Sequence, residues 1–209
     1  NNHASTLRVP AAGTLHALVA DHVVHGRVIF PGAGYLELAR AAASTDMALR
    51  GVFCLQPLAV ELAGLLVECA VADGRFEVRS GEADGVRADA AVHCSGALAA
   101  GGEMQRIEHA SARSRSGASG AVVGAQYDGF DAAGLEYGPV YRARERAHAA
   151  GDDAAAADGA TGGARRGAAA RLRSTARLRG VAVHPAELDG ALQLGGALAP
   201  VGPAADGAT

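Results

Sequence analysis

The sequence predicts an α+β fold in which antiparallel sheet covers buried helices. Two observations carry this prediction. Between residues 51 and 98, stretches of alternating apolar and polar residues are separated by turn signals at Asp73-Gly74 and 81–85, which is typical of antiparallel strands. After Pro31 and again after Pro185, apolar residues recur at helical spacing. Helices packed against antiparallel sheet in this way are an α+β arrangement.

The composition excludes several classes of protein. With 209 residues, of which 49% are hydrophobic, the chain can bury the core of one large domain or two small ones. Aromatic residues make up only 4%, so the core must consist mainly of Leu, Val and Ala. The formal net charge of -3 argues against a nucleic-acid surface, which needs clustered positive charge. We therefore expect no nucleic-acid partner.

The cysteines and the apolar runs indicate the compartment. Cys54, Cys69 and Cys94 are widely spaced, so none forms the CxxC pair of a zinc site or a redox disulfide. No apolar run reaches the roughly 18 residues that cross a bilayer, and the first ten residues lack the order of a signal peptide. We expect a cytoplasmic protein with no membrane partner.

The first half, residues 1–110, is predicted to hold one helix wrapped by a sheet. Residues 14–30 contain β-branched residues and are interpreted as a strand or a loop leading into one, while strands ahead of His16 are expected to be reduced or absent. Pro31 suits the first turn of a helix that runs to about Ser44 and is apolar on most faces. The strands that follow are predicted within 51–71, 75–80 and 88–98.

Residues 111–120 are rich in Ser, Gly and Arg, and a solvated linker is predicted over 111–125. The second half is assigned to residues 126–209 and includes a helix that begins at Pro185. Within it, residues 142–179 consist mainly of Ala, Gly, Asp and Arg, which is typical of a low-complexity loop. A loop of that length is unusual inside a compact domain and weakens this interpretation.

Polar residues that could carry chemistry fall in three short segments. His22 lies shortly before the helix at Pro31, whose free N-terminal amides point back toward it. Tyr137 opens a Tyr-Gly-Pro segment. Asp189 and Gln193 stand four residues apart and therefore share one face of the second helix.

Each segment also has a simpler interpretation. His22 and His25 could be a metal pair, but no third ligand lies close by in the sequence. Asp189 and Gln193 could form an ordinary solvated helix face, and the Tyr-Gly-Pro segment could be only a turn. Gly32 begins a Gly-Ala-Gly run that lacks the third glycine of a dinucleotide-binding loop.

Together, the three segments resemble motifs of the dehydratase domains of modular polyketide synthases, in the order of that family. They read His22-x-x-x-Gly26-x-x-x-x-Pro31, Tyr137-Gly138-Pro139 and His184-Pro185-x-x-x-Asp189-x-x-x-Gln193. The resemblance implies a double hot dog fold, with two long helices each wrapped by an antiparallel sheet and one active site between the halves. Few residues follow Leu198, so we expect an incomplete second half, as in a fragment, a sequence with missing stretches or a degenerate domain.

The resemblance also implies a reaction. A 3-hydroxyacyl thioester on an acyl carrier protein loses water and becomes a 2-enoyl thioester during polyketide chain elongation. The elimination needs a base at the α-carbon, an acid at the β-hydroxyl and donors for the enolate-like oxygen. We expect His22 to be the base and Asp189 the acid, kept protonated by an apolar pocket. Tyr137 and Gln193 are expected to bind the hydroxyl, and the Gly32 amide to polarise the thioester carbonyl.

No metal or organic cofactor is expected, since the phosphopantetheine arm would belong to the carrier protein. The expected partners are that acyl carrier protein, other domains of the same polyketide synthase module and a second copy in a homodimer. Two alternatives stay open: an isomerase or cyclase variant, or an inactive domain kept as a structural part of the megasynthase. Both His22 and Asp189 are present, which favours dehydration because loss of hydroxide needs an acid.

Overall fold

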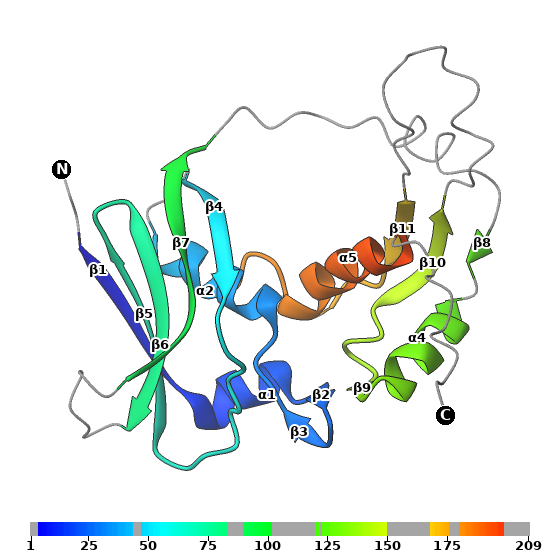
Figure 1. Ribbon diagram of the computed structural model, residues 1–209, viewed down its shortest axis with the longest axis horizontal. Coiled ribbons are helices and arrows are strands. Elements are labelled where there is room, and N and C mark those ends of the chain that lie inside the picture. The colour runs from blue at the N-terminus through cyan, green and yellow to red at the C-terminus, as the bar shows by residue number, and fades with distance from the viewer. Residues whose placement is uncertain are drawn as a thin grey trace, which may run out of the picture.

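A computed structural model shows one five-stranded sheet and, beside it, two three-stranded sheets with their helices (Figure 1). It describes residues 4–43, 47–82, 90–101, 120–121, 123–149, 168–175 and 180–198. None of the helices in these ranges has both the length and the apolar character that a bilayer crossing requires.

The five-stranded sheet is built from the first half of the chain, with antiparallel neighbours in the order β1-β5-β6-β7-β4. Its strands are β1 (Ser5–Pro10), β4 (Met47–Cys54), β5 (Leu65–Ala72), β6 (Arg75–Glu82) and β7 (Ala91–Ala100). The predicted turn between β5 and β6 is confirmed. Asp73 and Gly74 have φ of 52° and 69°, the left-handed values of a two-residue hairpin turn.

The helix predicted after Pro31 is confirmed as α2 (Gly32–Ala42), which packs against the five-stranded sheet. Its inner face and the sheet bury a cluster of aliphatic and aromatic side chains, which includes Tyr35, Val67, Phe76 and Val78. Gly34 is needed at the first turn of α2, because a Cβ there would lie 2.7 Å from the Phe30 ring. Packing of this density fixes α2 relative to the sheet.

The expectation that strands ahead of His16 are reduced or absent is wrong. β1 lies there and pairs along its whole length with β5. Leu7 and Val9 pack against the core while Thr6, Arg8 and Pro10 are exposed, which is the alternation of an edge strand with one buried face. The sequence signal for this strand is weak because it is short and ends in Pro10.

Residues 14–30 also differ from the predicted strand. The irregular turn Ala11–Leu15 leads into the short helix α1 (His16–Val19), and extended structure begins only afterwards, in the hairpin β2 (His22–Val24) and β3 (Arg27–Val28). Leu15 and Val19 are buried but Ala17 between them is exposed, which fits a helix, because a strand would place all three on one face.

The second half contains more regular structure than its composition predicts. Between 142 and 179, taken as a low-complexity loop, lie β10 (Arg144–Ala149) and β11 (Ala168–Leu172), which pair with each other. Alanine and arginine have weak strand preferences, so pairing and burial, as at Ala147, decide the conformation. The loop interpretation is therefore wrong for these strands, and residues 150–167 and 176–179 lie outside the described ranges.

The helix predicted at Pro185 is confirmed as α5 (Pro185–Leu198). It contacts β11 and β10 along one side and α2 at its start (Figure 1). An unpredicted helix, α4 (Val123–Ala132), precedes β9 (Leu135–Tyr137). The two-residue strand β8 (Gly120–Ala121) completes the sheet order β11-β10-β8. The linker and half boundaries stay predictions, since residues 111–119 lie outside the described ranges.

The third sheet, in the order β3-β2-β9, joins the two halves. β2 comes from the first half and β9 from the second, and they pair antiparallel with His22 opposite Tyr137. Two further backbone hydrogen bonds extend the pairing, from the His25 amide to the Gly134 carbonyl and from the Gly138 amide to the Asp21 carbonyl, both 2.8 Å. This small sheet therefore brings the His22 and Tyr-Gly-Pro segments together.

Candidate active site

One backbone hydrogen bond, to a residue shortly before α2, orients the His22 ring. Its Nδ1 donates a hydrogen bond to the carbonyl oxygen of Ile29, 2.6 Å away. Because a carbonyl can only accept, Nδ1 carries the proton in the neutral ring, and Nε2 is left with a free lone pair. The imidazole is thus held in the tautomer that a general base needs.

Aromatic rings surround this imidazole. The centroids of Tyr137 and Tyr141 lie 5.4 and 5.2 Å from that of His22. Tyr137 also packs edge-on against Phe130, with centroids 5.5 Å apart. Burial, and then the negative charge of Asp189, raise the pKa of Tyr137 to about 12, so its hydroxyl stays protonated and able to donate a hydrogen bond.

Asp189 and Gln193 lie on α5 and face inward. The Gln193 Nε2 donates to the Asp189 Oδ2 at 2.8 Å. His22, Tyr137, Asp189 and Gln193 are each only 8% exposed, so the solvated-face interpretation of the last two is wrong. The Gln193 Oε1 is buried and has no hydrogen-bond partner in the described ranges.

Burial raises the pKa of Asp189 above its usual value. Three groups oppose this effect, first the charge of His22, then the hydrogen bond from Gln193 and the charge of Arg144. Asp189 also interacts with Tyr137, whose ring centroid lies 5.4 Å from that of His22, so both interactions place the carboxyl beside these two rings. The structure therefore gathers His22, Tyr137, Asp189 and Gln193 from both halves into one buried cluster, which we call the His22–Asp189 cluster.

The first turn of α5 is fixed by hydrogen bonds outside the helix. The Ala186 amide donates to the Nδ1 of His184 at 3.2 Å, so His184 caps the helix. Burial lowers the pKa of His184 and favours the neutral ring that can accept this bond. The Glu187 carboxylate accepts from the amide and hydroxyl of Thr175, at 2.6 and 2.7 Å.

The Tyr-Gly-Pro segment is a turn, but it also positions side chains of the cluster. The Asp21 carboxylate accepts a hydrogen bond from the Val140 amide at 2.7 Å. Gly138 lies directly against Asp21, since a Cβ on Gly138 would come within 2.5 Å of the Asp21 Cγ. The motif therefore needs glycine for close approach, and Asp21 ties the turn to β2.

Two buried residues beside the cluster were not predicted from the sequence. Tyr141 is fully buried, its hydroxyl has no hydrogen-bond partner among the described residues, and its position four residues after Tyr137 is the only sequence signal for it. Arg144 is buried with its guanidinium 4.9 Å from the Tyr127 ring centroid, and its Nη1 donates to Gln126. Nothing in the sequence distinguishes Arg144 from a solvated arginine.

Gly32 is the first residue of α2 and is exposed. A Cβ there would meet only the Cys54 Sγ, at 3.9 Å, and the role of its amide stays a prediction. All three cysteines carry free thiols. In the described ranges, no group of three or more His, Cys, Asp or Glu side chains is arranged to hold a metal ion.

Comparison with known proteins identifies the family. The family described as polyketide synthase dehydratase domain matches residues 5–81, and the polyketide synthase dehydratase N-terminal domain matches residues 105–209. Polyketide synthase ThaG of Burkholderia thailandensis is 36% identical over 191 residues. The chain belongs to the polyketide synthase dehydratase family. The match to ThaG covers 84% of this chain and 3% of ThaG, so this dehydratase domain corresponds to a small part of that synthase.

Solved dehydratases share the fold. The dehydratase domain from the CurF module of curacin polyketide synthase has a TM-score of 0.72 and 20% identity, over 97% of this chain and 72% of its own. A trans-AT polyketide synthase dehydratase domain from Brevibacillus brevis has a TM-score of 0.70 and 23% identity, over 96% and 71%. The double hot dog prediction is confirmed, and the partial coverage of the solved dehydratase chains fits the expected incomplete second half.

Proposed function

We propose that this polyketide synthase dehydratase domain removes water from a 3-hydroxyacyl thioester carried on an acyl carrier protein. The observation that carries the proposal is the His22–Asp189 cluster, in which an imidazole and a carboxyl from opposite halves of the chain interact in a buried setting. Burial favours the protonated form of Asp189, which is the form that a general acid needs.

The proposed elimination uses the lone pair on the Nε2 of His22 and the proton on the Asp189 carboxyl. The Nε2 of His22 takes the α-proton, and the electron pair of the C–H bond forms the new double bond. The bond between the β-carbon and oxygen breaks as Asp189 donates its proton to the leaving hydroxyl, which departs as water. His22 ends as imidazolium and Asp189 as carboxylate, and transfer of the proton from one to the other restores the starting state.

The remaining residues would bind and orient the substrate. The Tyr137 hydroxyl stays protonated and would donate a hydrogen bond to the β-hydroxyl, and the unpaired Gln193 Oε1 would accept one from it. The Gly32 amide, at the positive end of α2, would polarise the thioester carbonyl. The proposed chemistry uses four side chains and one backbone amide, and the phosphopantetheine arm would be supplied by the carrier protein.

Related structures support the roles of a histidine and an aspartate. The CurK dehydratase has been solved as a His-to-Phe and as an Asp-to-Asn mutant, both described as inactive. We propose the corresponding dependence on His22 and Asp189 here. We also propose that the partners are the carrier protein, neighbouring domains of a polyketide synthase and a second copy of the domain.

An isomerase is the second candidate. The fold matches GphF Dehydratase 1 with a TM-score of 0.61, and a variant of that domain is described as isomerase-inactive. Moving a double bond needs proton transfer but no leaving hydroxyl, so the same cluster could serve it. The two candidates differ in product mass, because only dehydration removes a water.

The proposal is tested with a 3-hydroxyacyl thioester on an acyl carrier protein and mass spectrometry of the acyl chain. We expect loss of one water with the wild-type chain, and no turnover with His22→Phe or Asp189→Asn at unchanged secondary structure. Wild-type turnover in either variant would overturn the role of that residue. A 2-enoyl substrate that is converted without a change of mass, while the 3-hydroxyacyl substrate is not, would favour the isomerase.

A further inference from the structure

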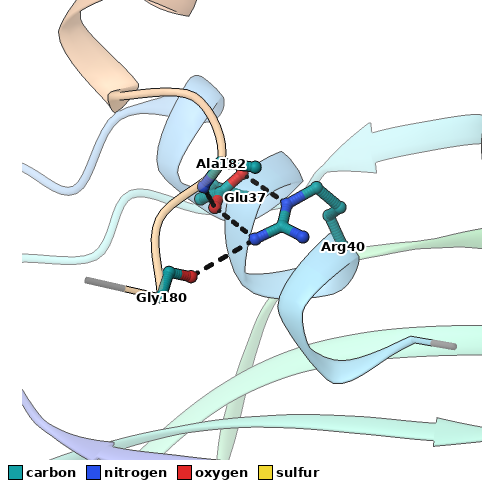
Figure 2. Close-up of polar contacts among 4 residues, drawn as sticks. All are labelled: Glu37, Arg40, Gly180 and Ala182. Carbon is teal, nitrogen blue, oxygen red and sulfur yellow. Dashed lines mark hydrogen bonds and ion pairs between the residues drawn. The ribbon is translucent and has the colours of Figure 1, made fainter. Parts of the chain in front are cut away.

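A buried carboxylate on α2 binds the segment that leads into α5. Glu37 accepts two hydrogen bonds from Arg40 on the next turn, from Nε at 2.8 Å and from Nη2 at 2.6 Å (Figure 2). Its Oε1 also accepts the amide of Ala182 at 2.7 Å. Arg40 donates further to the carbonyl of Gly180 at 3.3 Å. Figure 2 shows all four residues in one network between α2 and the loop before α5.

The segment that these bonds hold is mostly exposed. Gly180, Ala182 and Val183 are exposed, and Val181 is half-buried. Gly180 has φ of 84°, a left-handed conformation in which the chain turns back toward α2. Charge-assisted hydrogen bonds to a buried carboxylate are stronger and more directional than neutral ones. The Glu37–Arg40 pair therefore restrains this exposed part of the loop at two points, the Gly180 carbonyl and the Ala182 amide.

The restrained loop ends where α5 begins. Two residues after Ala182 comes the helix cap His184, and Asp189 lies just over one turn farther along α5. The other end of the same α2 helix lies near His22, whose Nδ1 donates to Ile29 three residues before α2. One rigid helix thus connects the His22 side of the cluster with the start of the helix that carries Asp189.

We infer that Glu37 and Arg40 are positioning residues for Asp189, fixing the start of α5 on α2 and so the separation of the Asp189 carboxyl from the His22 imidazole. The inference rests on the proposed function of those two residues. Displacements of about 1 Å at a catalytic group can cost a hundredfold in rate, so a restraint of this kind acts on turnover even though it touches no substrate.

The test compares Glu37→Gln, Glu37→Ala and Arg40→Ala in turnover of a 3-hydroxyacyl thioester on its carrier protein. Glu37→Ala removes every bond of the network to Glu37, and we expect kcat to fall about tenfold or more while KM changes by less than about twofold. Glu37→Gln can still accept from the Ala182 amide but loses the ion pair, so its kcat should lie between those of wild type and Glu37→Ala. Unchanged kcat in Glu37→Ala would overturn the inference.

The pH dependence of kcat distinguishes a positioning role of Glu37 from a general effect on stability. When α5 shifts, water reaches Asp189 and lowers its pKa, so the alkaline limb of kcat should move to lower pH in Glu37→Ala. The charged and titratable groups that face this carboxyl in the described ranges are His22 on β2, Tyr137 on β9, Tyr141 in the turn that follows and Arg144 on β10, and none of them is altered. A variant that loses thermal stability but keeps the wild-type limb would show a merely structural role.

The chain offers a matched control in Arg8→Ala. Arg8 and Glu68 also form an Arg–Glu ion pair, at 2.5 Å, which joins β1 and β5 within the five-stranded sheet. Exposed pairs of this kind contribute little to stability. We expect wild-type kcat and an unchanged pH limb in Arg8→Ala. A loss in Arg8→Ala equal to that in Arg40→Ala would overturn the inference.

Amide hydrogen exchange gives a readout without turnover. In Glu37→Ala we expect faster exchange at Ala182 and in the first turn of α5, with β5 and β6 unchanged; unaltered exchange there would also overturn the inference. Failure of the proposed function looks different. In that case His22→Phe would turn over substrate like the wild type, while the exchange result for Glu37→Ala would still hold.

Discussion

His22 and Tyr137 lie directly opposite each other on the paired strands β2 and β9, with their ring centroids 5.4 Å apart. One strand comes from each half of the chain, so the backbone pairing sets the distance between the two side chains. The cluster therefore depends on main-chain hydrogen bonds as well as on the packing of α5.

Asp189→Asn should raise stability at neutral pH while it abolishes turnover. The pKa of Asp189 is raised in the folded protein, so its ionisation costs folding free energy. The contribution of protonated Asp189 is fully present below the unfolded pKa of about 4 and is lost as pH rises through the folded value. Thermal unfolding of the wild type and Asp189→Asn across this pH range should show that the stability gained by the variant grows with pH. A difference independent of pH would contradict the raised pKa.

Gln193→Leu should shift the alkaline limb of turnover to higher pH. The hydrogen bond from Gln193 favours the ionised form of Asp189 and lowers its pKa, so its loss leaves the acid protonated to higher pH. The pH dependence of kcat measures the limb directly. Since Gln193 is also proposed to bind the substrate, KM should rise in the same variant, and a limb that moves to lower pH would be inconsistent with this account.

Tyr137→Phe should lower kcat about tenfold to a hundredfold, the usual range for a lost hydrogen-bond donor in a catalytic site. Tyr141→Phe is the matched control. Its hydroxyl is buried without a partner, so removing that oxygen should leave stability unchanged or slightly higher. Steady-state turnover and thermal unfolding of the two variants test this prediction. Equal losses of kcat would contradict the role of the Tyr137 hydroxyl as a hydrogen-bond donor to the substrate.

Gly138→Ala should destabilise the domain by about 1–3 kcal/mol, because the new Cβ would overlap the Asp21 carboxyl. Turnover should fall with it, since this turn holds Tyr137 and Tyr141 in the cluster. Gly129→Ala in α4 serves as the control, for a Cβ there meets nothing within 4 Å and alanine favours helix. Chemical unfolding of both variants should give changes of opposite sign.

The sequence predicted the parts of this fold that rest on strong local patterns. α2 and α5 follow proline and helical apolar spacing, and the β5–β6 hairpin follows the Asp73-Gly74 turn. The strands β10 and β11 could not be predicted, because their alanines and arginines have little strand preference and depend on pairing with distant residues.

The candidate site was predictable in its polar members but not in its surroundings. Motif spacing pointed to His22, Tyr137, Asp189 and Gln193, which the structure brings together. Burial of Arg144 against the Tyr127 ring could not be foreseen, since a long charged side chain is usually solvated and only the tertiary packing removes it from water.

The shared sheet β3-β2-β9 has a consequence for hybrid enzymes assembled from two parents. A crossover between β7 and α4 would put the β2 of one parent beside the β9 of the other. Main-chain hydrogen bonds between β2 and β9 can form whatever the side chains are. The close contacts of the two glycines that flank β9 depend on the sequence of both parents. Gly134 and Gly138 leave room for His25 and Asp21. A recombinant with a larger residue at either glycine would push β2 and β9 apart and separate the residues of the His22–Asp189 cluster, however well each parental half folds.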